Sequence, residues 1–261
     1  MFGLFKKKVR ESEQQQDVHL GMILFEHLDN YRLEDALKRL QNYWDIQTEQ
    51  LETDDSGAAF MAEGMSVTIM NMNIAIPLQE LEQAASIAYN WPSAEETIKI
   101  QRSHVIIAVL PSLKSQIDRY FLISKIVESI LSTSVALGVY SGGQSLLISK
   151  QQYLNSMANF KEHAVLPIDL WVYVGLAKFE DGCAGYTYGL CYFNKLEMEI
   201  IKSELNLEEI YELIINTCAY VIQNNIAFKE GQTVGITNEE KIRLTISEGL
   251  LVQGMSIKLV T

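Results

Sequence analysis

The sequence contains few cysteines and no paired arrangement of them. Its 261 residues include three, Cys183, Cys191 and Cys218, and none of them belongs to a C-x-x-C motif. An odd number of thiols without such a motif is typical of a protein that folds in a reducing compartment. The sequence therefore predicts a cytoplasmic protein without disulfides, and a chain of this length can bury enough apolar surface to be stable without them.

The sequence also lacks long hydrophobic runs. Nowhere do about 18 apolar residues follow one another, which is the minimum for a membrane-spanning helix. At the N-terminus the apolar residues 1–5 precede Lys6, Lys7 and Lys8, the reverse of the order in a secretory signal. We therefore expect no integral membrane association, and we expect residues 1–20 to form a flexible N-terminal tail.

Positive charge is scarce. Lysine and arginine total 21 against 33 aspartates and glutamates, so the formal net charge is -12. Nucleic acids are bound through clustered cations, so the composition argues against a nucleic-acid partner. A basic protein is the natural complement of such a surface, although solubility alone also favours an acidic one.

Motifs that carry familiar chemistries are missing. The segment 141–145 (SGGQS) has glycines but no phosphate-binding lysine, and no G-x-S-x-G nucleophile motif occurs. The four histidines, at 19, 27, 104 and 163, show no metal-ligand spacing. The sequence therefore predicts no metal, no cofactor and no identifiable catalytic residue.

The N-terminal half shows a regular alternation of element types. Apolar runs predict strands at 21–26, 58–63, 65–72 and 104–110, and helical periodicity marks 33–44 and 78–88. Residues 48–57 are polar and acidic and are expected to form a loop. This βαββαβ order is that of the ferredoxin-like split βαβ fold, and the run at 104–110 is apolar enough for a central strand.

A second half follows an added helix at 117–132 and strands at 136–140 and 145–148. Residues 150–164 are polar and are the best candidate for a boundary. Beyond them we expect strands at 170–176 and 186–193, a long helix from 207, and alternating antiparallel strands at 242–247 and 255–259. The predicted class is α+β, with a ferredoxin-like half (21–150) and an antiparallel-sheet-plus-helix half (165–261), or one continuous domain.

A tyrosine-rich segment supplies the candidate binding residues. In an extended strand Tyr186 and Tyr188 share one side, where they can form a recognition surface or pack at the edge of the core, and Gly189 would allow close approach of a ligand or backbone. Glu197 and Glu199 share one strand face about 7 Å apart. Such a pair can act as acid and base or grip a cation, but a solvated pair is commoner.

Six segments stand out for their order along the chain: 76–82 (IPLQELE), 103–109 (SHVIIAV), 166–174 (LPIDLWVYV), 186–190 (YTYGL), 196–200 (LEMEI) and 230–235 (EGQTVG). Together they resemble an uncharacterised bacterial family, the domain of unknown function numbered 4261 (DUF4261). The resemblance extends over most of the chain from about Gly21, and it implies no activity and no catalytic residue. Domains of this kind recur beside bacterial toxin and conflict systems, which implies an immunity or binding role.

Three functions remain open from the sequence. The first is a non-enzymatic binding, immunity-type or regulatory module that uses an acidic surface against a basic partner. The second is an enzyme that uses Glu197, Glu199 and nearby tyrosines in a cleft. The third is a structural subunit that forms a homo-oligomer through its strand edges or its tyrosine face.

Overall fold

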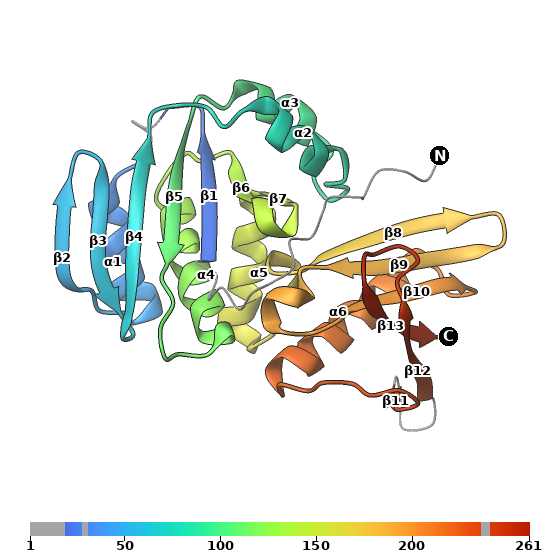
Figure 1. Cartoon of the computed structure of the whole chain (residues 1–261). Coiled ribbons are helices and arrows are strands. Elements are labelled where there is room, and N and C mark those ends of the chain that lie inside the picture. Colours follow the sequence, from blue (N-terminus) through green and yellow to red (C-terminus); the bar gives the residue numbers. More distant parts are fainter. Residues whose placement is uncertain (1–18, 28–30, 236–240) are drawn as a thin grey trace. The chain divides into compact units, whose positions relative to one another are not determined.

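The computed structural model describes residues 19–27, 31–235 and 241–261 (Figure 1). These residues form an α+β protein with two sheets, one of seven strands and one of six, and six α-helices. They fold as two compact units, which succeed one another along the chain at Trp171 and Val172. We call them the first unit, up to Trp171, and the second unit, from Val172.

The first unit is built on the seven-stranded sheet, in the order β2-β3-β4-β5-β1-β6-β7, with antiparallel pairing throughout. Its elements are β1 (His19–Phe25), α1 (Leu33–Trp44), β2 (Glu49–Asp54), β3 (Gly57–Ala62), β4 (Met65–Met72), α2 (Leu78–Ser86), α3 (Ala94–Ile100), β5 (Ser103–Val109), α4 (Gln116–Ser132), β6 (Gly138–Ser141), β7 (Leu146–Ser149) and α5 (Lys150–His163).

Helices cover this sheet unequally on its two faces. Helices α1 and α4 contact each other on one face, where α4 lies against β1 and β5 (Figure 1). A side chain at Gly21 of β1 would reach Val127 and Ile123 of α4 at about 3.5 Å. On the other face α2 and α3 pack over Leu24 of β1. Strand β5, whose residues are nearly all buried, takes the central position that its sequence predicts.

The ferredoxin-like arrangement is not confirmed. In that fold the first strand of the chain lies between the second strand of the hairpin and the last strand, and it pairs with both. Here β4 pairs with β5, and β1 lies between β5 and β6. The order of elements along the chain does not fix which strands pair, and β5 lies between β1 and β4 in the sheet.

The second unit contains the six-stranded sheet, in the order β11-β12-β13-β10-β9-β8. Strands β10 and β13 pair in parallel, so the sheet is mixed and not purely antiparallel as expected. A parallel pair needs a long connection, and α6, β11 and β12 supply it. The elements are β8 (Tyr173–Phe179), β9 (Gly182–Tyr188), β10 (Glu197–Ser203), α6 (Leu207–Gln223), β11 (Thr233–Gly235), β12 (Lys241–Glu248) and β13 (Met255–Val260).

Three local expectations require correction, and one helix is additional to those predicted. The predicted loop 48–57 contains β2, whose six residues are all exposed and therefore show no apolar alternation. The stretch 150–164, where Tyr153, Met157 and Phe160 recur at loose helical spacing, forms helix α5, and the sequence gives no prediction of helix α3. The strand predicted at 186–193 begins earlier, at Gly182, and ends at Tyr188. Of the predicted tail, residues 1–18 lie outside the described residues, whereas His19 and Leu20 begin β1.

No helix within the described part of the chain is both long enough and apolar enough to cross a membrane.

Candidate functional site

The two tyrosines singled out in the sequence lie on β9 and pack within the second sheet. The ring of Tyr186 covers Gly175 of β8, where a Cβ atom would come within 2.2 Å of the ring. The rings of Tyr173 and Tyr186 meet edge to face, with centroids 6.2 Å apart. Burial raises the pKa of both Tyr186 and Tyr188, so both phenols are neutral at pH 7. Both side chains are half-buried.

Glu197 organises the turn that follows β9. Its carboxylate is buried and accepts hydrogen bonds from Thr187 Oγ1 at 2.6 Å and from the backbone N–H groups of Gly189 at 3.0 Å and Cys191 at 3.2 Å. Gly189 has φ of 121°, a conformation that favours glycine. In the structure this glycine therefore serves a turn that is held closed by Glu197.

Glu199 is fully buried and holds the loop between β12 and β13. Three successive backbone N–H groups, of Leu250, Leu251 and Val252, donate to its carboxylate. Ser256 Oγ donates at 2.5 Å, and Lys258 Nζ forms an ion pair with it.

Burial opposes ionisation of Glu199, but its partners outweigh that effect. The hydrogen bonds from Lys258, Ser256 and the backbone of Leu251, together with the charge of Lys258, lower the pKa of Glu199 below its ordinary value. The carboxylate is therefore ionised at neutral pH. It takes the place that an anion would occupy in a ring of backbone donors.

The interpretation of Glu197 and Glu199 as a solvated pair is wrong, because both side chains are buried and hydrogen-bonded. Their oxygens serve two different loops. Nearby, desolvation and then the Glu197 carboxylate raise the pKa of the Cys191 thiol to about 12, so it is not a thiolate at pH 7. Within the described ranges, no group of three or more His, Cys, Asp or Glu residues is arranged to hold a metal ion.

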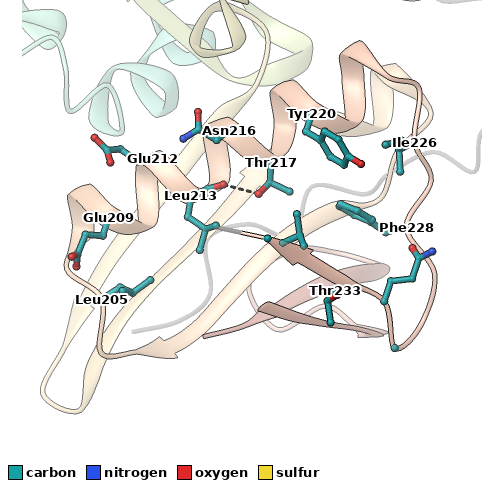
Figure 2. Close-up of a pocket in the computed structure, with 14 residues that line it drawn as sticks. Leu205, Glu209, Glu212, Leu213, Asn216, Thr217, Tyr220, Ile226, Phe228 and Thr233 are labelled. Carbon is teal, nitrogen blue, oxygen red and sulfur yellow. Dashed lines mark hydrogen bonds between the residues drawn. The ribbon is translucent and has the colours of Figure 1, made fainter. Parts of the chain in front are cut away.

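The second unit also has a surface groove beside α6. A groove of about 1160 Å³ separates this helix from the segment 226–235, which includes β11 (Figure 2). None of the four sequence-predicted residues lines it. The described lining consists of Leu205, Glu209, Glu212, Leu213, Asn216, Thr217, Tyr220, Ile226, Phe228, Gly231, Gln232, Thr233, Val234 and Gly235.

The sequence of α6 explains how one of its faces is held and another is left free. Asn206 accepts from the backbone of Glu208 and Glu209, and Glu209 accepts in return from the Asn206 N–H, which closes a capping box. The buried face of the helix rests on β9, where Gly185 has no side chain to collide with Ile210. The helix is thereby fixed, and its outer face forms one wall of the groove.

The groove is acidic at one end and aromatic at the other. Exposed Glu209 and Glu212 lie near the start of α6, and Tyr220 lies near its end, where its ring is 6.5 Å from that of Phe228 (Figure 2). At about 1.5 Å per residue, Glu209 and Tyr220 are about 16 Å apart along the helix. Thr217 donates its hydroxyl to the Leu213 carbonyl at 2.7 Å.

The lining described by the structure contains two carboxylates and neither lysine nor arginine. Its opposite wall includes β11, which ends the strand order of the second sheet. An extended segment of about five residues spans 16 Å. A short segment with a cationic end and an apolar end therefore matches the groove in length and charge.

Sequence reasoning did not find this groove, because its residues come from two segments that show no shared pattern. The sequence of α6 nevertheless contains one indication of the groove. The residues Glu209, Glu212, Asn216 and Tyr220 recur at spacings of three and four along α6, which marks a single polar and aromatic helix face.

Comparison with known families and proteins gives one positive finding. Residues 186–260 match the family described as Domain of unknown function (DUF4261). This match spans the end of β9 through β13, including Glu197, Glu199 and the groove. The upstream segments that resemble the family in the sequence lie outside the match. No curated protein and no solved structure matches the chain.

Proposed function

We propose that the DUF4261 domain at residues 186–260 is a non-enzymatic binding module whose groove takes a basic, partly apolar segment of another protein, and that the chain acts as an immunity-type or regulatory protein. The observation that carries the proposal is the groove itself, with carboxylates at one end and two aromatic rings at the other. Cationic side chains of the partner lie against Glu209 and Glu212, and an apolar side chain lies between Tyr220 and Phe228.

The edge of the sheet adds a second source of affinity. Strand β11 pairs with β12 on one side, and it is the last strand of the described sheet on the other. A peptide in the groove runs alongside this edge and uses its backbone groups, as in strand addition. The side chains along α6 then select which peptides fit.

Tyr186, Tyr188, Glu197 and Glu199 support the groove without touching the partner. Glu197 closes the turn that precedes β10, and Glu199 fixes the loop before β13. The alternative of an enzyme built on these carboxylates has less support, because each carboxylate already accepts several hydrogen bonds from the protein itself. In this proposal the four residues hold the sheet on which α6 rests.

Selection of peptides tests the proposal directly. A displayed library of random seven-residue peptides is selected on the full chain and counter-selected on the Glu212→Lys and Tyr220→Ala variants, both of which alter exposed side chains. We expect enriched peptides with lysine or arginine next to an aromatic or aliphatic residue. Binding of a synthetic enriched peptide, measured by fluorescence anisotropy, weakens at least tenfold in either variant and at 0.5 M salt.

A matched control separates the groove from general charge effects. Glu208→Lys makes the same change of charge on the same helix, but Glu208 does not line the groove. We expect it to leave peptide binding within about twofold. Equal loss in Glu208→Lys and Glu212→Lys, selection of acidic peptides, or no enrichment at all contradicts the proposal.

A further inference from the structure

A second pocket, of about 530 Å³, lies in the first unit at one end of its sheet. It is formed where β1 and β4 end and where β5 begins, beside the turn between β2 and β3. Ser103 begins β5, Asn71 lies near the end of β4, and Tyr31 precedes α1. This pocket is independent of the groove, and it is built from a different kind of side chain.

Three polar atoms in the wall of this pocket are buried and unsatisfied. Tyr31 Oη, Asn71 Oδ1 and Ser103 Oγ have no hydrogen-bond partner among the described residues. Ser103 is only 1% exposed. A buried polar group without a partner costs about 1–3 kcal/mol, so three in one pocket require an explanation.

Strand pairing and aromatic packing position the residues that carry these three groups. Ser103 is the register partner of Phe25, and the Phe25 ring lies 6.0 Å from that of Tyr31. Asn71 is fixed through its backbone, whose N–H donates to the Ser56 carbonyl at 2.7 Å. Ser103 and Asn71 therefore lie in paired strands, and the Tyr31 ring packs against Phe25.

The chemistry of the pocket differs between its base and its rim. The three unsatisfied groups are neutral, and burial raises the pKa of Tyr31, which keeps the phenol protonated. Charges of both signs stand at the rim, with Glu26 and Asp55 against Arg102. Arg102 is oriented by donating Nη1 to the Lys99 carbonyl at 2.7 Å. A charged group at the neutral base would lose its hydration without gaining an opposite charge.

We infer that this pocket binds a small uncharged polyhydroxyl compound of about monosaccharide size. Each hydroxyl of such a ligand donates to one group and accepts from another, which suits Ser103 and Tyr31, while Asn71 Oδ1 takes a donated hydrogen. The volume is within the range of small-ligand sites. Rim carboxylates and Arg102 can bind outer hydroxyls without requiring charge on the ligand.

Protein-detected NMR on the full chain tests this inference. D-glucose, D-galactose, D-ribose and myo-inositol are titrated separately to 50 mM, and the backbone amide signals of Asn71, Asn73 and Ser103 are followed. We expect at least one compound to shift these signals saturably. If none of the four does so, the inference is wrong. Stronger binding of glucose 6-phosphate than of glucose contradicts the assignment of an uncharged ligand.

Two variants remove the proposed contacts while leaving the packing intact. Ser103→Ala and Tyr31→Phe each delete a hydroxyl that has no partner in the described structure, so we expect neither to lower the melting temperature. Each should weaken sugar binding at least threefold, whereas Ser66→Ala, on β4 but outside the pocket, should not. Equal affinity in all three variants overturns the inference, as does stabilisation by the deletions without any sugar binding, which indicates a water-filled cavity.

Discussion

The two units bury carboxylates with different kinds of partner. In the first unit Glu128 of α4 accepts from side chains of α1 and of its own helix, namely Arg39 Nη2 at 2.6 Å, Trp44 Nε1 at 2.7 Å and Ser132 Oγ at 2.7 Å. In the second unit Glu199 accepts mainly from the backbone of a loop. The first carboxylate joins two helices, and the second determines the conformation of a loop.

This difference shows where each unit is sensitive. A helix keeps its own backbone hydrogen bonds when one side-chain contact is removed, whereas the loop at 249–254 loses partners for its N–H groups when Glu199 is removed. The Glu199 side chain therefore matters more for local order than the Glu128 side chain. Four predictions test that contrast.

The largest effect is expected for Glu199→Ala. The variant removes the ion-pair partner of the mostly buried Lys258 and the acceptor of three partly buried backbone N–H groups, which should lower the free energy of unfolding by about 3–5 kcal/mol. Chemical denaturation followed by circular dichroism measures the change. Glu180→Ala, in the exposed turn between β8 and β9, is the control and should change stability by less than about 0.5 kcal/mol. Similar values for the two variants would contradict the role of Glu199.

Glu128→Ala should cost less, about 1–3 kcal/mol, because Arg39 is partly exposed and can be solvated. All three tryptophans, Trp44, Trp91 and Trp171, lie in the first unit. We therefore expect a changed tryptophan emission in Glu128→Ala and an unchanged native emission in Glu199→Ala. A loss in Glu128→Ala larger than that in Glu199→Ala would reverse the proposed contrast.

Acid should remove the contribution of Glu199. Its pKa is lowered in the folded protein from an ordinary value of 4.5, so its stabilisation is complete above that value and is lost as the pH falls through the folded pKa. The stability difference between the wild type and Glu199→Gln should therefore be constant from pH 7 to about pH 5.5 and shrink below 4.5. Urea denaturation at a series of pH values measures it, and a difference independent of pH down to 3 would exclude this linkage.

The smallest effects are expected for substitutions at the N-caps of α4 and α6. The two units are alike here, because each of these helices begins with a capping box. Ser115 with Asp118 caps α4, and Asn206 with Glu209 caps α6. Ser115→Ala and Asn206→Ala should each cost about 1 kcal/mol. Thermal unfolding of both variants measures this, and a loss in only one of them would show that the two boxes are not equivalent.

The sequence predicted elements better than it predicted their partners. Helices α1, α4 and α6 follow from apolar periodicity, and β5 follows from its unbroken apolar run. Strand β2 was not predicted, because all its residues are exposed and its sequence shows no apolar alternation. The parallel pairing of β13 with β10 was not predicted, because an alternating pattern shows which side chains share a face of the sheet but not which strands are adjacent.

The candidate sites show the same limit. The strand spacing identified Glu197 and Glu199 as a pair, but burial and hydrogen bonding came from loops at 189–191 and 250–252, which no local pattern connects to them. The groove depends on the approach of 226–235 to α6, and the polar pocket depends on three strand ends. Each is a product of tertiary packing.

The position of β13 also bears on how the second unit is made. This strand lies between β10 and β12, although it follows both along the chain. Until residues 255–260 have been synthesised, β10 and β12 each have an additional unpaired edge, and unpaired strand edges promote aggregation. When β13 inserts between β10 and β12, it pairs residues that are distant in sequence, such as Glu197 and Ser256. Contacts between residues far apart in sequence form slowly. A nascent chain is thus most vulnerable after β12 and before β13 has emerged from the ribosome.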